Sequence, residues 1–218
     1  MNPPLAFIAG STGATGRTLQ AIAQHNKIAC TPHVRTKSAA KAPPNAAILD
    51  LDDSVALKAE LKSCDVVVQL IGTMKKRFAT GDTYETSDIG TTRLLVNAAL
   101  ESDIKHLILL SSVGAGKPKG AYLQAKAEAE AIVLSSGLAY TIFRPSMFEG
   151  DYHGRIPGAR KLTEFFGMKR YQPIALTELA GAILHVAQTS NPLGEILEGE
   201  SLWREVERAR QAGYCAVE

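Results

Sequence analysis

The order of apolar stretches along this 218-residue chain constrains its fold more than any other feature. Short runs rich in Val, Ile, Leu and Ala alternate with longer segments whose apolar residues recur at helical spacing. Strands are predicted over residues 5–9, 28–34, 46–50, 65–71, 105–112 and 139–144. Helices are predicted over residues 16–26, 53–63, 84–102, 122–137 and 201–211, and residues 173–188 are expected to form a short strand followed by a helix. This alternation predicts βαβ units, and hence an α/β fold with a doubly wound parallel sheet and helices on both faces.

Composition narrows the class of protein. Hydrophobic residues make up 45% of the chain and charged residues 21%, which is typical of a soluble globular protein. The net charge is only +2, so we expect no nucleic-acid or membrane-surface partner. Three cysteines in no paired motif favour a reducing compartment, and we expect a cytoplasmic protein without a leader peptide. No stretch approaches the ~20 apolar residues of a spanning helix. We expect a single domain over residues 1–218.

Three glycines follow the first predicted strand. In "FIAGSTGATG", Gly10, Gly13 and Gly16 are three residues apart and precede a predicted helix. At the first strand-to-helix turn of a parallel sheet, glycines let the backbone approach a pyrophosphate at the helix N-terminus. The spacing is GxxGxxG rather than the usual GxGxxG, and a plain glycine bend is the alternative interpretation. Its position in the chain favours a dinucleotide site of the Rossmann type.

The end of the second strand indicates which dinucleotide binds. An NAD site usually carries an acidic residue about 20 residues after the turn, where it accepts a hydrogen bond from the ribose 2′-hydroxyl. This chain instead has "HVRTKS", with Arg35 and Lys37 and no acid nearby. A guanidinium matches the geometry of a 2′-phosphate. We therefore expect NADP(H), with NAD(H) as the less favoured cofactor and solvated loop cations as the alternative.

A serine, a tyrosine and a lysine form a candidate catalytic group. Tyr122 and Lys126 are four apart on a predicted helix and so share one face. A lysine there can lower the pKa of the phenol from its usual ~10, so that the tyrosine exchanges a proton with a carbonyl oxygen. Ser112 ends a strand at the edge of the sheet where ligands bind. The alternative is an ordinary helix surface, because this tyrosine–lysine spacing is common by chance.

These motifs together resemble a known family. "GSTGATG", "QLIGT", "SDIGTTRLLVNAA", "HLILLSSVGAG", "YLQAKAEAE" and "SGLAYTIFRPSMFEG" are similar to the short-chain dehydrogenase/reductase superfamily. The likeness is to its atypical NAD(P)H-binding branch, which includes Tat-interacting-protein-like and NmrA-like proteins. The chain departs from the pattern in the short gap between Ser112 and Tyr122. It also carries Asp88 where many extended members have Asn.

The resemblance assigns roles to individual residues. It implies that Tyr122 is the acid/base, that Lys126 also holds the nicotinamide ribose, and that Ser112, or less favourably Ser111, orients the substrate. The implied cofactor-binding residues, counted with Arg35, Lys37 and Lys126, are Gly10, Thr12, Gly13, Ala14, Thr15, Gly16, Asp50, Leu51, Ile71, Gly72, Thr73, Ser111, Pro145, Ser146, Met147 and Phe148.

The sequence therefore predicts an NADPH-dependent oxidoreductase that transfers hydride to a small carbonyl or quinone-like substrate. A small C-terminal cap over the substrate is expected at residues 149–172. Two alternatives stay open: a non-catalytic NADP(H)-binding regulator, and a flavin or quinone reductase in which Tyr122 is incidental. No metal-binding motif occurs, and either a monomer or a homodimer fits the sequence.

Overall fold

Seven parallel strands form the central sheet of the protein. The computed structural model describes residues 3–73, 81, 83–149, 163 and 166–214. Across the sheet the strand order is β3-β2-β1-β4-β5-β6-β9. The strands are β1 (Ala6–Ala9), β2 (Cys30–Val34), β3 (Ala47–Ile48), β4 (Val66–Gln69), β5 (His106–Leu110), β6 (Tyr140–Phe143) and β9 (Glu195–Leu197). The order reverses between β1 and β4, and in such sheets the ligand crevice lies at the carboxyl ends of the strands at this point.

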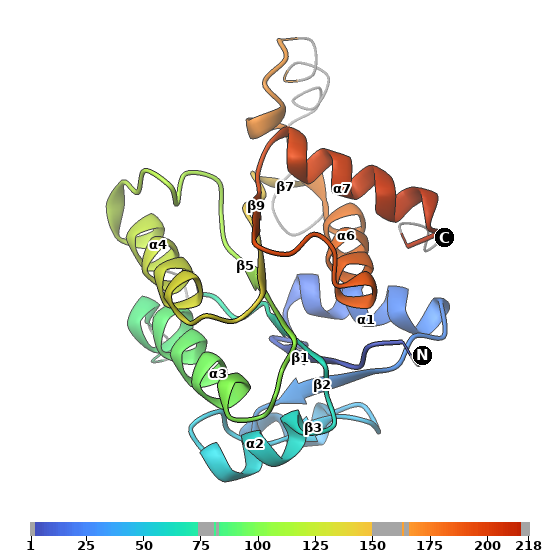
Figure 1. Cartoon of the computed structure of the whole chain (residues 1–218), viewed down its shortest axis with the longest axis vertical. Coiled ribbons are helices and arrows are strands. Elements are labelled where there is room, and N and C mark those ends of the chain that lie inside the picture. Colours follow the sequence, from blue (N-terminus) through green and yellow to red (C-terminus); the bar gives the residue numbers. More distant parts are fainter. Residues whose placement is uncertain (1–2, 74–80, 82, 150–162, 164–165, 215–218) are drawn as a thin grey trace.

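Helices cover both faces of the sheet (Figure 1). One face carries α1 (Ala14–His25), α6 (Leu176–Thr189) and α7 (Glu200–Gln211). The other carries α2 (Ser54–Leu61), α3 (Thr91–Leu100) and α4 (Gly120–Ser135). Successive strand residues point to opposite faces, so Ile8 packs in the first core cluster and Phe7 in the second. The predicted Rossmann-type, doubly wound fold is confirmed.

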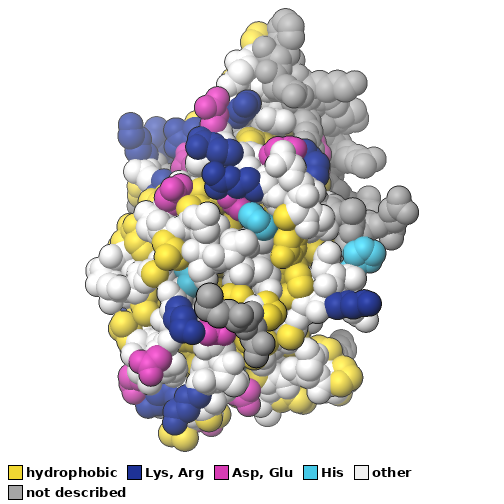
Figure 2. Space-filling model, turned by 45° about the vertical axis from the view of Figure 1, so that its right-hand side comes forward, with side chains coloured by type: hydrophobic (Ala, Val, Ile, Leu, Met, Phe, Trp, Pro, Cys, Tyr) yellow, Lys and Arg dark blue, Asp and Glu magenta, His cyan; other side chains and the backbone are white. Residues whose placement is uncertain are grey.

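The C-terminal helix α7 docks on the chain's own core. Leu202, Val206 and Ala209 are buried in the cluster that α6 helps to form. Ion pairs flank this contact, including Arg210 with Glu178 at 3.1 Å. The view in Figure 2 brings this side of the molecule forward and shows positive and negative side chains close to one another. The predicted amphipathic helix over residues 201–211 is thus present, and its apolar face is covered.

The structure differs from the sequence prediction at several elements, among them β9 and the helix expected over residues 84–102. Strand β9 was not predicted, because it has only three residues and begins with the exposed Glu195. The predicted helix over residues 84–102 is divided into a π-helical segment, η3 (Glu85–Gly90), and α3. π turns inside helices are frequent at functional sites. Two short 3-10 segments, η1 (Thr36–Lys41) and η4 (Lys169–Tyr171), lie in stretches for which no helix was predicted.

A second, two-stranded parallel sheet lies beyond the end of β6. Its strands are β7 (Phe148–Glu149) and β8 (Ile174–Ala175), and Phe148 is paired with Ile174. Most of the predicted cap at residues 149–172 lies outside the described residues, which leave out 150–162 and 164–165. None of the helices in the described ranges is long and apolar enough to cross a membrane.

A buried histidine makes the stability of this fold depend on pH. His106 is fully buried, and its Nε2 lies 2.8 Å from the Thr141 hydroxyl oxygen. That hydroxyl donates its only proton to the carbonyl oxygen of Pro192, so the imidazole must donate its Nε2–H to Thr141. Burial lowers the pKa of His106 from 6.5 to about 4. The folded state therefore holds a neutral ring where the unfolded chain binds a proton.

We expect the free energy of unfolding to fall as the pH drops from 6.5 toward 4, because only the unfolded state takes up this proton. The loss should amount to roughly 2 kcal/mol between about pH 7 and about pH 5. Urea denaturation at several pH values would measure it. His106→Gln keeps a donor for Thr141 without the titration, and so should remove this part of the slope. A slope that is equal in both proteins would contradict the prediction.

Candidate cofactor site and catalytic residues

The turn between β1 and α1 requires glycine at two of its three glycine positions. Gly10 has φ +92°, and a Cβ there would lie 2.9 Å from the backbone N of Ile71. A Cβ on Gly16 would lie 2.3 Å from the carbonyl oxygen of Gly10. Gly13 precedes α1, and no side chain caps the first turn of that helix. The turn is thus narrow, and the N-terminus of α1 is suited to an anion.

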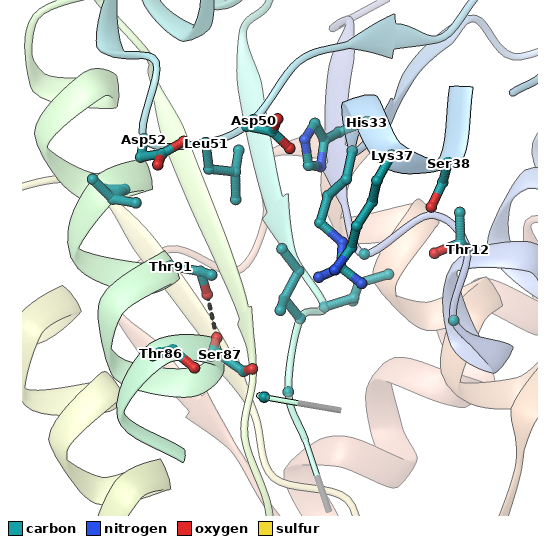
Figure 3. A pocket seen from close by; sticks show the side chains of 18 residues that line it. Thr12, His33, Lys37, Ser38, Asp50, Leu51, Asp52, Thr86, Ser87 and Thr91 are labelled. Carbon is teal, nitrogen blue, oxygen red and sulfur yellow. Dashed lines mark hydrogen bonds between the residues drawn. The ribbon is translucent and has the colours of Figure 1, made fainter. Parts of the chain in front are cut away.

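A cavity of about 470 Å³ opens beside this turn, at the carboxyl ends of the central strands (Figure 3). Its volume is in the usual range for a small-molecule site. Residues around the glycine turn and η1 form one side of it, and η3 and α3 form the other. The lining residues are Gly10, Thr12, Gly13, His33, Arg35, Lys37, Ser38, Asp50, Leu51, Asp52, Leu70, Ile71, Gly72, Gly81, Thr86, Ser87, Thr91 and Leu94.

Many of the residues predicted to bind the cofactor line this cavity together. Gly10, Thr12 and Gly13 come from the turn, and Ile71 and Gly72 from the end of β4. The others are Arg35, Lys37, Asp50 and Leu51. Ala14, Thr15 and Gly16 form the first turn of α1 next to the cavity. Thr73 is buried, and its backbone N–H donates to the Asp88 carboxylate at 3.0 Å.

The charges around the cavity are mixed. Arg35 and Lys37 come from the end of β2 and from η1, and the Lys37 side chain extends into the cavity (Figure 3). Two carboxylates, Asp50 and Asp52, follow β3 on another side. His33 adds no charge near neutral pH, because burial lowers the pKa of its imidazole.

Nine lining residues were not predicted from the sequence. They are His33, Ser38, Asp52, Leu70, Gly81, Thr86, Ser87, Thr91 and Leu94. His33 and Ser38 belong to the same local stretch as Arg35, so their neighbourhood in the sequence was a usable signal. The residues of η3 and α3 are far from the glycine turn in sequence, and only the sheet topology brings them opposite it.

Tyr122 and Lys126 lie one turn apart on α4, as their spacing predicts. The Lys126 Nζ is 6.0 Å from the centroid of the Tyr122 ring. Tyr122 is 36% exposed, and its ring lies against Tyr84, with centroids 5.9 Å apart. Ser112 follows β5 and is partly buried, and its hydroxyl lies 3.5 Å from the carbonyl oxygen of Val113.

The ammonium of Lys126 is held in a buried environment. Its Nζ lies 2.8 Å from Oδ1 of Asp88 and donates to the carbonyl oxygen of Leu110 at 3.3 Å. A Cβ on Gly72 would lie 2.8 Å from this Nζ, so the lysine packs directly against the backbone after β4. Gly72 lines the cavity, so Lys126 contacts one of its lining residues, whereas Lys126, Tyr122 and Ser112 are not themselves among the described residues that line it. Asp88 was noted in the sequence only as a departure from the family pattern.

Ser111 faces a different group of side chains. Its hydroxyl donates to the carboxylate of Glu130, which is 3% exposed. Glu130 also accepts two hydrogen bonds from Arg144, whose Nη1 donates to Glu198 at 3.1 Å. The hydrogen bond with Glu130 is the main cause that raises the pKa of Arg144. In this structure Ser111 is therefore part of a buried charged network behind Ser112.

The four predicted nicotinamide neighbours follow β6. The carbonyl oxygen of Pro145 accepts from the Val113 N–H at 2.9 Å, and the Ser146 hydroxyl donates to the carbonyl oxygen of Gln172. Met147 is 57% exposed, and Phe148 lies in β7. They are not among the described residues that line the cavity. Within the described ranges, no group of three or more His, Cys, Asp and Glu side chains is placed to hold a metal ion.

The site fits a dinucleotide in two respects. A Cβ at Gly10 or Gly16 would clash with the backbone, so the turn carries no side chain at these positions. The backbone amides at the N-terminus of α1 can therefore bind a pyrophosphate. The adjoining cavity offers apolar side chains, such as Leu51 and Ile71, together with the two cations of Arg35 and Lys37. A dinucleotide needs apolar neighbours for its adenine ring and positive groups or backbone amides for its phosphates.

Comparison with known proteins gives concordant matches. A model of a family described as NAD(P)H-binding matches residues 10–189, which is most of the chain. Protein FMP52, mitochondrial, of Candida albicans is 27% identical over 154 residues, covering 66% of this chain and 67% of that protein.

Two solved structures share the fold at low identity. One is a Bacillus halodurans protein described as a candidate NAD-dependent epimerase/dehydratase, with TM-score 0.69 and 20% identity over 94% of this chain and 99% of that one. The other is a short-chain dehydrogenase/reductase superfamily protein of Agrobacterium tumefaciens with bound NAD. Its TM-score is 0.68, with 16% identity over 96% of this chain and 83% of that one.

Proposed function

Since this chain belongs to the NAD(P)H-binding family, we propose that it is an NADPH-dependent oxidoreductase that reduces a small carbonyl or quinone-like compound. The observation that carries the proposal is the position of Lys126. Its Nζ packs against Gly72, which lines the cavity, and the same lysine is 6.0 Å from the Tyr122 ring. Tyr122 is thus linked to the cavity through Lys126 and Gly72.

The proposed cofactor contacts follow the cavity. The pyrophosphate is held at the start of α1 by Gly10, Thr12, Gly13, Ala14, Thr15 and Gly16. Arg35 and Lys37 bind the 2′-phosphate, Asp50 and Leu51 flank the adenine, and Ile71 to Thr73 contact the adjoining ribose and phosphates. The cofactor supplies the hydride when it is bound. Pro145 to Phe148 border its nicotinamide end, where Lys126 holds the ribose.

The protein's own side chains handle the substrate and the proton. Tyr122 donates its phenolic proton to the substrate oxygen as that oxygen gains negative charge. Ser112 donates a hydrogen bond to the same oxygen and so orients the substrate. Tyr122 is 36% exposed, so water can reach the phenolate and return a proton to it.

A second candidate function is a non-catalytic NADP(H)-binding regulator. The lining of the cavity favours it, because Ser112, Tyr122 and Lys126 are not among the described residues that line it. Both functions share the cofactor site and differ only in turnover. Oxidation of NADPH by the wild type with a panel of acceptors separates them, because a regulator reduces none.

Arg35→Ala is expected to weaken NADPH binding by roughly 10- to 100-fold, the equivalent of losing one charged hydrogen-bonding partner of the 2′-phosphate. The affinity for NADH, which lacks this phosphate, should change little. Fluorescence titration with both nucleotides measures the two affinities. Lys105→Ala, which removes an exposed cation at the start of β5, is a matched control. Equal weakening of both nucleotides would refute the assignment of Arg35.

The compartment and the oligomeric state stay predictions. We propose the cytoplasm as the location, whereas the Candida relative is named as a mitochondrial protein. Fractionation of cells that express the chain would decide between the two. Size measurement by light scattering would distinguish a monomer from a homodimer.

A further inference from the structure

The ion pair between Asp88 and Lys126 is buried, and neighbouring atoms fix its position. Asp88 is 1% exposed and Lys126 is 7% exposed. Oδ2 of Asp88 accepts from the backbone N–H of Thr73 at 3.0 Å, which leaves Oδ1 directed at the lysine at 2.8 Å. The backbone of Asp88 is also held, because its carbonyl oxygen accepts from the Thr92 hydroxyl at 2.6 Å. The carboxylate is therefore positioned by the fold.

The surrounding elements make this pair possible. Asp88 lies in the π-helical segment η3, whose wider turn precedes α3. Gly72, at the end of β4, provides the space for the ammonium, since a Cβ there would lie 2.8 Å from Nζ and 3.0 Å from Oδ1 of Asp88. The end of β4 and the segment η3 thus meet at Lys126 of α4. A side chain larger than glycine at position 72 would displace the pair.

The pair changes the electrostatic environment of Tyr122. The titratable groups placed around the Lys126 ammonium by the described elements are Asp88 and Tyr84, from or next to η3, and Tyr122, from α4. Glu130, one turn further along α4, is engaged by Ser111 and Arg144. Asp88 is thus the acid in contact with Lys126, and its negative charge offsets the positive charge beside the phenol.

The neighbouring tyrosine is consistent with this balance. The pKa of Tyr84 is raised, first by burial and then by the negative charge of Asp88. Tyr84 and Tyr122 are in ring contact, so the field of Asp88 extends over this aromatic pair. A negative charge near a phenol favours its protonated form.

We propose that Asp88 is a positioning residue that holds Lys126 and neutralises its charge, so that Tyr122 stays protonated and acts as a proton donor. This inference rests on the proposed reductase function. In that reaction the carbonyl carbon gains the hydride and the carbonyl oxygen takes the phenolic proton, while NADPH is oxidised to NADP⁺. The resulting phenolate recovers its proton from water. Asp88 thereby extends the pH range of reduction to the alkaline side.

Spectroscopic titration of phenolate formation in the cofactor-free protein tests this without any turnover. The difference between the wild type and Tyr122→Phe isolates the Tyr122 signal, and the same difference is measured in the Asp88→Asn background. We expect Asp88→Asn to lower the midpoint of Tyr122 ionisation by about one pH unit or more, because Lys126 is then uncompensated. Glu85→Gln removes an exposed carboxylate from the same segment and should leave the midpoint unchanged. An unchanged or raised midpoint in Asp88→Asn would overturn the proposal.

A second pair of variants covers the case in which Asp88→Asn does not fold. Lys126→Met leaves Asp88 uncompensated, so the Tyr122 midpoint should rise above that of the wild type. Asp88→Asn combined with Lys126→Met removes both charges and should return the midpoint toward the wild-type value. A Lys126→Met midpoint equal to that of the wild type would count against neutralisation by Asp88.

Kinetics then separate this proposal from the reductase function. In an active enzyme, the alkaline limb of kcat/KM for carbonyl reduction should move to lower pH in Asp88→Asn, by the same amount as the titration midpoint. A limb that does not move in an active variant overturns the role of Asp88. If the midpoint shifts but the wild type reduces no acceptor, the effect of Asp88 on Tyr122 stands and the reductase function fails.

Discussion

Tyr122→Phe is expected to lower kcat/KM for carbonyl reduction by roughly 10²- to 10⁴-fold, the usual contribution of a positioned proton donor. The substitution removes one hydroxyl from a ring that is 36% exposed, so the fold should tolerate it. Lys126 would keep its contacts with Asp88 and Leu110. We therefore expect NADPH affinity to change by less than about twofold, a free-energy change below ~0.4 kcal/mol.

Oxidation of NADPH, followed with a panel of carbonyl and quinone acceptors, measures this effect. Tyr84→Phe is the matched control, because it removes a hydroxyl from the ring in contact with Tyr122. Carbonyl reduction should survive in the control. If Tyr122→Phe reduces quinones as fast as the wild type, a flavin or quinone reductase that does not use Tyr122 is favoured. If the wild type binds NADPH tightly and reduces nothing, the regulator is favoured.

Gly16→Ala should abolish measurable cofactor binding and destabilise the protein by about 3 kcal/mol, near the upper end for an overpacked site. The added Cβ would lie 2.3 Å from the Gly10 carbonyl oxygen and 2.7 Å from the Ser11 Cα. Both obstacles are backbone atoms of the turn, which cannot rotate away as a side chain would. Relief requires α1 to move from the end of β1, and this movement opens the pyrophosphate turn.

Gly13→Ala provides the control in the same turn. Its Cβ would lie 3.3 Å from the same carbonyl oxygen, and its φ of −73° suits alanine. We expect a loss of stability below about 1 kcal/mol, because a few tenths of an ångström of adjustment suffice. Denaturant unfolding and NADPH titration of both variants give the comparison. Equal effects of the two substitutions would show that the turn between β1 and α1 does not require glycine at position 16.

Much of the fold was predictable because its central strands carry a simple signal. Phe7 and Ile8 are both buried, on opposite faces, so the strand reads as a continuous apolar run. Strand β9 has no such signal, because it has only three residues and the first of them is an exposed glutamate. The π-helical segment η3 was equally hidden, since its residues suit an α-helix and its hydrogen bonds depend on tertiary packing.

The candidate site was predictable only where it is local. Arg35 and Lys37 follow one strand, and both line the cavity. The sequence could not show that Asp88 reaches Lys126, because 38 positions separate them and the contact depends on Gly72. The sequence also could not show which of the adjacent serines after β5, Ser111 or Ser112, belongs to the buried charged network. Ser111 is turned to Glu130 because Arg144, on another strand end, holds that carboxylate in place.

The pairing of β7 with β8 bears on how this protein can diversify. Phe148 and Ile174 lie side by side, so the two ends of the segment between them are close together. The entropic cost of closing a loop between fixed ends grows only slowly with its length. Residues between these two strands can therefore be lengthened, shortened or replaced while the sheet and the glycine turn keep their geometry. Evolution could exchange this one insert and leave the cofactor half untouched.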